Sequence, residues 1–409
     1  MRNILILLAL GIFVACNNSA KTNVSNNSLE NENKNADTII YPGIYQTDLY
    51  LNLISDKKIG IVSNQTGVIN NIHLVDTLLS LKQNVLKVFC PEHGFRGTAD
   101  AGQTIETGID EKTGIFITSL YGKNKKPTPE QLADLNVVIF DLQDVGVRFY
   151  TYISTLHYVM EACAESNIPL IVLDRPNPNA HYIDGAVLDT ANYRSFIGMH
   201  PVPIVYGMTI GEYAQMINGE KWLRNGIQCK LTVIPCKNYT HNTKYSLPVK
   251  PSPNLPNDRA IELYPTLCFF EATTLSVGRG TDKQFQILGH PSLSVVEEAS
   301  FTFTPMPNEG AKDPVLNGQL CYGFDLSENS SIFEWKNDRI NISLIIAVYK
   351  LFPKNELFFK KTNSIELLSG YAEFRTQIEN GISEEEIRKG WKQGIENFKT
   401  IRSKYLIYE

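Results

Sequence analysis

Residues 137–148 have the sequence VVIFDLQDVGVR, in which four apolar residues precede a segment with two acidic residues, a glycine and an arginine. The apolar run Val137–Phe140 has the composition of a strand that is buried on both faces of a parallel sheet. In open parallel sheets, ligands bind outside the carboxyl ends of the strands. The polar segment after Phe140 therefore predicts that this end of the sheet carries the chemistry.

Four further segments in the first half of the chain repeat this arrangement of an apolar run and a polar end. The runs are Ile59–Val62, Val85–Cys90, Ile115–Leu120 and Leu170–Leu173, followed respectively by Ser63-Asn64-Gln65-Thr66-Gly67, Pro91-Glu92-His93-Gly94, Tyr121-Gly122 and Asp174-Arg175-Pro176-Asn177. Because parallel strands end at the same edge of a sheet, we expect these polar ends to converge on one crevice.

Helical patterns separate the runs. We expect helices near Leu74–Lys82, after Thr128-Pro129-Glu130, over Tyr152–Cys163 and over Met208–Asn218 with Thr209 as its cap, and another strand over Leu231–Ile234. This alternation of strands and helices predicts the α/β class, with a Rossmann-like parallel sheet covered by helices on both faces.

The alternation ends in a proline-rich segment, where four prolines fall within residues 248–256. We expect the join between two domains there. We expect the first domain, with the parallel α/β sheet, to cover residues 41–257, and the second, a C-terminal α+β domain that mixes strands and helices without this alternation, to cover residues 258–409. In the second domain we expect a C-terminal helix from Ser383 to about Tyr405.

The first sixteen residues have the features of an export signal. A positive start is followed by the apolar stretch Ile4–Val14, which is too short to span a bilayer, and by Ala15-Cys16. This end resembles a lipoprotein cleavage box, although Phe13 stands where such boxes usually have Leu. We expect a signal peptide over residues 1–16 and lipidation of Cys16. The product is an exported lipoprotein of the cell envelope that faces the periplasm and contacts the membrane through its lipid only; an ordinary secretory signal or an uncleaved anchor stays open.

The composition and charge of the chain limit the kinds of partner that we expect. Residues 17–40 are rich in Asn and Ser and predict a disordered tether. The chain of 409 residues has a net charge of −5 and no long basic run, which indicates no nucleic-acid partner and favours a small or neutral polymeric substrate. The six cysteines after Cys16 lack metal-site spacing, and a disulfide between Cys229 and Cys236 stays open.

Glu92 is the leading candidate for catalysis. It directly follows a strand and precedes His93-Gly94. A carboxyl group at the dry end of a strand suits a general acid, and His93 is expected to orient it or to bind a substrate oxygen. The alternative is that Glu92 only caps the following turn.

Other charged residues at the strand ends are weaker candidates. Asp141 and Asp144 precede Arg148, and an ion pair that fixes the loop is as good an interpretation as catalysis for Asp141. Asp174 and Arg175 stand in a rigid turn, where the arginine binds either a substrate carboxylate or its own neighbours.

The second half of the chain adds three candidates. Glu271 lies among apolar residues, which indicates a partner or a task, and the partner is expected to be the glycine-flanked Arg279. Asn257, at the domain join, is a candidate cleft residue. A metal site built from His93, Asp141, Asp144 and Asp174 is the weaker alternative, because the sequence has no HExxH helix and its seven histidines are scattered. We therefore expect no metal and no cofactor.

Several of these segments, taken in order, resemble the NamZ family of exo-acting β-N-acetylmuramidases. The strings that carry the resemblance are Gly60-Ile61-Val62-Ser63-Asn64-Gln65-Thr66-Gly67, Pro91-Glu92-His93-Gly94-Phe95-Arg96-Gly97, Asp141 to Tyr152, Asp174-Arg175-Pro176-Asn177-Pro178, Pro253-Asn254-Leu255-Pro256 and Gly278-Arg279-Gly280-Thr281. The resemblance runs from about Gly43 to the C-terminus. It implies a Rossmann-like domain, a smaller second domain and an active site between them.

The resemblance also implies a reaction, the hydrolysis of terminal N-acetylmuramic acid from the non-reducing end of peptidoglycan fragments. The family's catalytic glutamate falls on Glu92. Glycoside hydrolysis usually needs a second carboxylate, for which we rank Glu271 above Asp144, unless the sugar's own acetamido group takes that role.

The substrate itself predicts further contacts. The lactyl carboxylate of muramic acid gives Arg148, Arg175 or Arg279 a reason to face the cleft, and Tyr150 and Tyr152 are expected to pack against a pyranose ring. Asn64, Gln65, Asp174 and Asn257 complete the expected substrate contacts. Peptidoglycan-derived muropeptides or glycan fragments are the expected partners. The alternatives are a muropeptide-binding lipoprotein without activity and a metal-dependent hydrolase.

Overall fold

The computed structural model describes residues 39–92, 94–96, 108–328 and 335–409. Residues Ile40–Glu409 form one compact unit. The predictions for the signal peptide, Cys16, the tether and His93 lie outside the described residues. The predicted division between residues 257 and 258 stays a prediction.

A seven-stranded sheet organises the first half of this unit. Its strands are β1 (Ile59–Ser63), β4 (Val85–Cys90), β5 (Gly108–Ile109), β6 (Phe116–Ser119), β7 (Val137–Asp141), β8 (Leu170–Leu173) and β9 (Leu231–Ile234). They lie in the order β5-β6-β4-β1-β7-β8-β9, and every pairing is parallel except the one between β5 and β6. The chain thus winds outward from β1 in both directions, which is the strand order of a Rossmann fold and confirms the predicted class.

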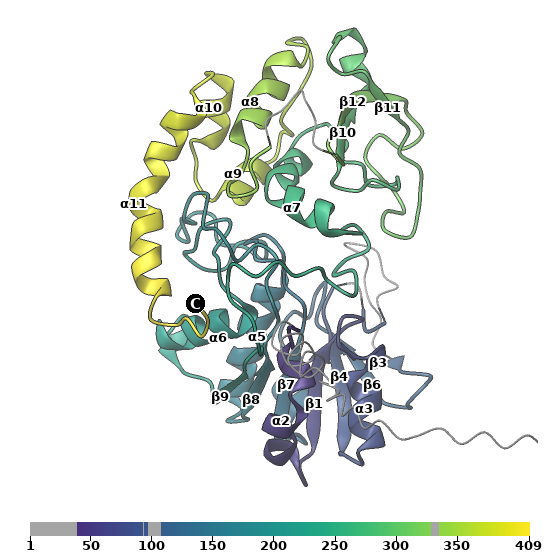
Figure 1. The fold of residues 1–409 in the computed structure, drawn as a ribbon, viewed down its shortest axis with the longest axis vertical. Helices are drawn as coiled ribbons and strands as arrows, with labels where there is room; N and C mark the ends of the chain where they lie inside the picture. The colour runs from purple at the N-terminus through teal and green to yellow at the C-terminus, as the bar shows by residue number, and fades with distance from the viewer. Residues whose placement is uncertain (1–38, 93, 97–107, 329–334) are drawn as a thin grey trace, which may run out of the picture. The chain divides into compact units, whose positions relative to one another are not determined.

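Burial on both faces explains why these strands are continuously apolar. Ile59, Ile61 and Ile139 pack with α2 (Thr47–Ile54) and α3 (Leu74–Ser80) on one face. Alternate residues such as Val62, Phe140 and Val172 pack with α5 (Tyr152–Glu165) and α6 (Ile210–Gly219) on the other face. Figure 1 shows these helices around the sheet. Both sides of β1, β7 and β8 therefore exclude water, and no polar alternation is needed in these strands.

Local signals set where two of the helices begin. Thr128 and Thr209 each accept a hydrogen bond from the backbone of the third helical residue, whose side chain bonds back to the cap. These capping boxes start α4 (Pro129–Leu132) and α6, as the sequence predicts for both threonines.

The second half of the unit carries a separate antiparallel sheet with strand order β10-β12-β11. Its strands are β10 (Ile287–His290), β11 (Phe301–Phe303) and β12 (Cys321–Asp325), and its helices are α7 (Asp258–Leu267), α8 (Ile342–Leu351), α9 (Ser364–Ser369), α10 (Phe374–Glu379) and α11 (Glu384–Arg402). The remaining elements are η1 (Gly43–Tyr45), β2 (Val68–Ile69), β3 (Ile72–His73), η2 (Arg224–Gly226), η3 (Cys268–Ala272) and η4 (Pro291–Val295). This smaller α+β part agrees with the predicted architecture.

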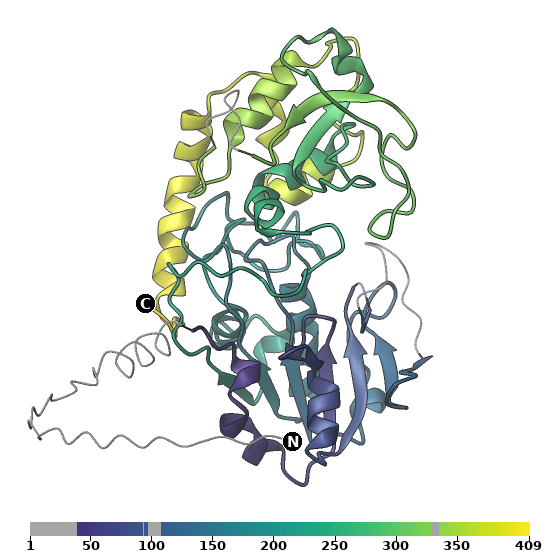
Figure 2. The same cartoon turned by 45° about the vertical axis from the view of Figure 1, so that its right-hand side comes forward.

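One continuous core joins the two halves. The cluster that covers one face of the sheet extends through α5 and α6 to residues of α7, α8 and α11. Helix α11 runs alongside both halves, and Figures 1 and 2 show its end beside α6. There Arg402 donates to the carbonyl oxygen of Gly207, and the Tyr405 hydroxyl donates to Glu220.

Two further findings concern the described residues as a whole. None of their helices is both long and apolar enough to cross a bilayer. Their six cysteines are free thiols, so Cys229 and Cys236 form no disulfide.

Candidate active site

A cavity lies where the loop after β4 and the start of α5 face α7 and the segment around Arg279. It contains about 410 Å³ of space outside the protein atoms, part of it open to solvent. Its lining residues are Glu92, Phe149, Tyr150, Thr151, Tyr152, Ser252, Asn254, Leu255, Tyr264, Arg279 and Phe285. Of the polar segments that were expected to converge, only the one after β4 supplies a described lining residue, Glu92, and we call this space the Glu92 cavity.

Two hydroxyl groups hold the Glu92 carboxylate. Thr151 occupies the N-cap position of α5 but makes no capping bond with its side chain; its hydroxyl instead donates to Oε2 of Glu92 at 3.1 Å. On another side lies Tyr121. Burial raises the pKa of this phenol, and the charge of Glu92 and a hydrogen bond between the two side chains raise it further. The carboxylate therefore has a defined orientation at the cavity wall.

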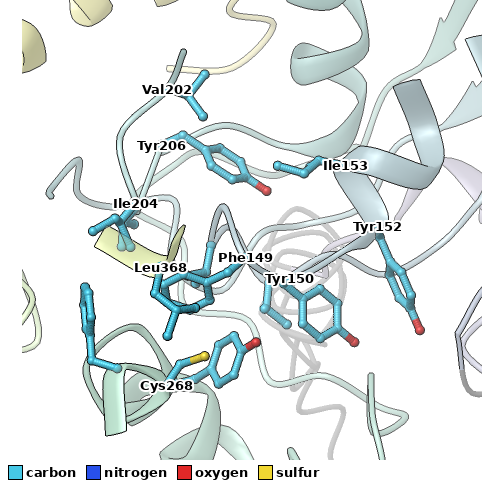
Figure 3. Packing of buried hydrophobic residues seen from close by; sticks show 14 of the residues in the cluster. Phe149, Tyr150, Tyr152, Ile153, Val202, Ile204, Tyr206, Cys268 and Leu368 are labelled. Atoms are coloured by element: carbon cyan, nitrogen blue, oxygen red, sulfur yellow. The ribbon is translucent and has the colours of Figure 1, made fainter. Parts of the chain in front are cut away.

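Two tyrosines form an aromatic wall of the Glu92 cavity. The rings of Tyr150 and Tyr152 meet edge to face at 4.8 Å, and both hydroxyls donate to the carbonyl oxygen of Pro251, at 2.7 and 3.3 Å. Figure 3 shows Phe149 beside them and the two phenol oxygens pointing the same way. Asn64 holds this wall from behind, because its Nδ2 donates to the Tyr152 hydroxyl at 2.7 Å. The tyrosines thus line the cavity as predicted, while Asn64 supports them.

Arg279, from the second half of the chain, also lines the Glu92 cavity. The flanking Gly278 and Gly280 both have φ of +80°, and a Cβ on either would lie 2.6 Å from neighbouring atoms, so this turn requires glycine. Nε of Arg279 donates to Oε1 of Glu271 at 2.7 Å, as the sequence predicts for this pair. The guanidinium carbon lies 5.0 Å from the centre of the Phe285 ring, within the range of a cation–π contact.

Glu271 and the remaining polar candidates lie outside this lining. Glu271 borders a smaller space that Arg279 also lines, and it is absent from the Glu92 cavity, where we expected the second carboxylate. Asn257 caps α7 through a bond from the Ala260 backbone at 2.9 Å, and Gln65 donates to the carbonyl oxygen of Lys250 at 3.0 Å. Both side chains serve the protein's own backbone.

The acidic residues at the ends of β7 and β8 form a second, buried group. Asp141 is fully buried, and its Oδ1 accepts from Nε of Arg175 at 2.7 Å. Asp174, also fully buried, accepts from Thr209 at 2.7 Å and Tyr408 at 2.5 Å. We call Asp141, Asp144, Asp174 and Arg175 the sealed cluster. None of the four lines the Glu92 cavity, so our expectation that Asp144, Asp174 and Arg175 face the substrate is wrong.

Asp144 shows what this environment does to a carboxyl group. It accepts from the Tyr206 hydroxyl and from the Gly146 backbone at 2.7 Å. Burial raises its pKa to about 6, against the lowering effect of these two bonds. Burial likewise raises the pKa of Asp174 to about 6. These shifts come from desolvation, which disfavours the ionised form, and they are therefore no evidence for a contact with substrate.

The position of Arg148 differs from our prediction that this side chain faces the cleft. Its side chain is fully buried, and Nη1 donates to the carbonyl oxygens of Ala186 and Val202 at 2.7 and 2.8 Å. Nη2 donates to those of Leu368 and Ser369, both at 2.9 Å. The guanidinium therefore ties together backbone segments far apart in the chain and does not face the cleft.

A bound metal finds little support in this arrangement. Within residues 39–92, 94–96, 108–328 and 335–409, no three His, Cys, Asp or Glu side chains are grouped as a metal site requires. His93, the one histidine in our candidate set, lies outside these ranges.

Several lining residues escaped the sequence analysis. Thr151 lies between Tyr150 and Tyr152 in the quoted string, and nothing in the sequence indicated that its hydroxyl donates to Glu92. Tyr264 and Phe285 have the appearance of core residues in the sequence. Phe285 has a φ of +51°, a conformation that is unfavourable for a bulky side chain and often marks a functional site, but only the structure reveals it.

Comparisons with known proteins agree with this architecture. Residues 59–259 match the family model described as "Exo-beta-N-acetylmuramidase NamZ, N-terminal", and residues 262–408 match the corresponding C-terminal model. The chain is 38% identical over 376 residues to the peptidoglycan β-N-acetylmuramidase NamZ of Bacillus subtilis strain 168, a match that covers 88% of this chain and 89% of the relative.

Two solved structures are also similar to this chain over most of its length. A DUF1343 family protein from Bacteroides fragilis is 45% identical with a TM-score of 0.82, and the match covers 91% of this chain and 99% of that one. A second DUF1343 family protein from the same organism is 27% identical with a TM-score of 0.75, covering 91% and 100%. Because family models match both halves and a relative shares more than a third of its residues over most of the length, the chain belongs to the NamZ family.

Proposed function

We propose that this protein is an exo-β-N-acetylmuramidase, which hydrolyses the terminal N-acetylmuramic acid from the non-reducing end of peptidoglycan fragments, with Glu92 as general acid. One observation carries the assignment of Glu92. Of the described residues that line the cavity, it alone bears a carboxyl group. The membership of the NamZ family, whose Bacillus subtilis member is a peptidoglycan β-N-acetylmuramidase, supports the reaction.

In the proposed step, protonated Glu92 donates its proton to the glycosidic oxygen as the bond to the anomeric carbon breaks. The leaving sugar departs with a new hydroxyl, and water supplies the hydroxyl at the anomeric carbon of the released N-acetylmuramic acid. Thr151 holds the side chain in one orientation, which favours proton transfer along a fixed direction. The sugar's own acetamido oxygen is the proposed internal nucleophile, because Glu271 borders a different space.

The surroundings of the cavity support exo action. The segment after β11 is tied to two positions at the cavity wall. The Met306 backbone donates to Gly280 at 2.9 Å, and Nδ2 of Asn254 donates to the carbonyl oxygen of Gly310 at 2.6 Å. A wall anchored in this way supports a cavity that accepts a chain end rather than the middle of a polymer.

The experiment uses purified protein with 4-nitrophenyl β-N-acetylmuramide and the matching β-N-acetylglucosaminide. We expect release of nitrophenol from the muramide, and release of single N-acetylmuramic acid residues from glycan fragments in product analysis. On glycan fragments, whose leaving sugar must be protonated, Glu92→Gln should lower kcat by about 10²- to 10⁴-fold at an unchanged melting temperature. Near-normal turnover by this variant would exclude Glu92 as the acid, and only internal cleavage products would exclude exo action.

We also propose that the protein is exported and anchored to a membrane of the cell envelope through lipidated Cys16. The support comes from the N-terminal sequence, where Ala15-Cys16 follows a short apolar stretch. Cys16→Ala should move the protein from the membrane fraction to the soluble fraction of cells. An unchanged distribution would contradict the lipid anchor.

A further inference from the structure

Three arginines were candidates to bind an anionic group of the substrate, and the structure separates them. Arg148 donates to four backbone carbonyl oxygens, and Arg175 is paired with Asp141. Both are buried, at 0% and 4% exposure. Of the described residues that line the Glu92 cavity, Arg279 alone is a cation.

The contacts of Arg279 leave the edge of its guanidinium that carries Nη1 and Nη2 available to a ligand. Nε donates to Glu271, and neither Nη1 nor Nη2 donates to any residue that the structure describes. The two Nη atoms form the end-on fork of an arginine, whose spacing matches the two oxygens of a carboxylate. The side chain retains 24% exposure, so this fork is accessible.

Three neighbours hold the guanidinium in this position. Glu271 fixes Nε, the Phe285 ring lies beneath the plane, and Lys360 donates to the Glu271 backbone oxygen at 2.7 Å, which anchors that residue in turn. Leu255 and Tyr264 also line the cavity, and apolar surroundings of this kind lower the local dielectric constant, which strengthens an ion pair with a ligand.

On this evidence, we propose that Arg279 binds the lactyl carboxylate of the terminal N-acetylmuramic acid through Nη1 and Nη2, and that Glu271 is a positioning residue that aims this fork. The proposal rests on the proposed function. It assigns to Arg279 the discrimination between muramic acid and glucosamine, which differ in the lactyl ether that carries the carboxylate.

The experiment compares three 4-nitrophenyl glycosides: the muramide, the muramide with its lactyl acid converted to the amide, and the glucosaminide. The amide keeps the shape of the lactyl group and removes its charge. For the wild type, we expect kcat/KM to be about 10- to 100-fold higher with the acid than with the amide. Arg279→Gln should bring this acid-to-amide ratio close to one, and Arg279→Lys should restore part of it.

Glu271→Gln tests the positioning role. The variant keeps an acceptor for Nε but loses the charge, so we expect the acid-to-amide ratio to fall by about 3- to 10-fold. A merely structural role would lower the melting temperature and leave the ratio unchanged, and that result would overturn the positioning role. An unchanged ratio in Arg279→Gln would overturn the whole proposal.

Arg375 offers a matched control. Its Nε also donates to a glutamate (Glu366, 3.0 Å), it also lies over an aromatic ring (Phe359, 5.4 Å), and its side chain has the same 24% exposure, but it is outside the lining of the Glu92 cavity. Unlike Arg279, it also donates through Nη2 to the carbonyl oxygens of Lys360 and Thr362. Arg375→Gln should keep the wild-type ratio of acid to amide. A fall like that of Arg279→Gln would show a general effect of removing such a pair and would overturn the proposal.

A binding measurement separates this proposal from the proposed function. Calorimetry with the Glu92→Gln protein should show tighter binding of N-acetylmuramic acid than of its lactyl amide, and adding Arg279→Gln should abolish the difference. If the wild type hydrolyses none of the glycosides, the proposed function fails, whereas equal binding of acid and amide overturns the role of Arg279.

Discussion

The sealed cluster and the Glu92 cavity contain the same kinds of side chain and differ in what surrounds them. Each has a carboxyl group that follows a strand of the seven-stranded sheet, together with an arginine; Arg175 follows β8 of that sheet, whereas Arg279 precedes β10 of the other sheet. In the sealed cluster, Asp141 and Arg175 pair with each other at 2.7 Å inside the protein. In the cavity, Glu92 and Arg279 both line the space, and the Nη atoms of the arginine donate to no residue that the structure describes. Charge alone at a strand end therefore does not mark a substrate contact; the partners of the charge decide.

The position of the sealed cluster makes this difference instructive. Strands β1 and β7 mark the point where the strand order reverses, and ligands of open α/β sheets commonly bind there. Here the Asp141–Arg175 pair occupies that place. Gly67 closes over it so tightly that a Cβ would collide with Ser63 and Asp141. The candidate site, the Glu92 cavity, lies instead near the end of β4.

Breaking the buried ion pair should have the largest effect on stability. Asp141→Ala leaves Arg175 buried without its partner, and we expect it to lower the free energy of unfolding by about 3–5 kcal/mol. Chemical denaturation followed by circular dichroism measures this. Asp325→Ala removes the partner of Lys283 in a more exposed pair, and we expect a loss of at most about 1 kcal/mol. Equal losses in the two variants would contradict the distinct role of the sealed cluster.

The pH dependence of Asp144 sharpens the comparison. Burial raises its pKa from 3.8 to about 6, so the folded protein binds a proton more tightly than the unfolded chain. The resulting stability is complete below about pH 4 and is lost as the pH rises through about 6. Asp144→Asn lacks this titration. The unfolding free energy of the variant minus that of the wild type should therefore rise by on the order of 2 kcal/mol as the pH goes from 4 to 7.5.

Other groups titrate in the same range with the opposite sign. Burial lowers the pKa values of His73 and His157 to about 4, so their contribution is present above pH 6.5 and is lost as the pH falls through 4. The wild type and the Asp144→Asn variant share these histidines, so their effect cancels in the difference. The measurement is therefore the difference between the unfolding free energies of wild type and variant at each pH. A difference that stays constant with pH would show that Asp144 is not held in this way.

The smallest effect is expected at the cavity wall. Thr151→Val removes the hydroxyl that donates to Glu92 and preserves the shape of the side chain, so kcat/KM for the muramide should fall roughly fivefold with little change in stability. Thr155 lies one turn further along α5, and its hydroxyl contacts only the carbonyl oxygen of Thr151. Thr155→Val should retain wild-type kcat/KM; equal losses in both variants would mean that the hydroxyl of Thr151 has no special role.

Local patterns in the sequence determined much of the fold. The strands over Val85–Cys90 and Leu170–Leu173 were predicted to the residue, because short, mainly apolar runs are typical of the strands of a covered parallel sheet. Thr128 and Thr209 marked the starts of α4 and α6, because a cap and its partner are three residues apart. The position of Glu92 at the carboxyl edge of the sheet also followed from the sequence, since it comes shortly after the run Val85–Cys90, which forms a parallel strand.

The tertiary structure alone decided which of the charged residues are available to a ligand. Arg148 is satisfied by carbonyl oxygens of residues up to 221 positions away, whereas Arg279 keeps its Nη atoms accessible, and their local sequences do not tell them apart. Capping and periodicity act between residues a few positions apart in the chain, so a sequence displays them directly. The satisfaction of a charge depends on partners that only folding brings within hydrogen-bonding distance, and this is why the sequence determined the scaffold while the structure determined the site.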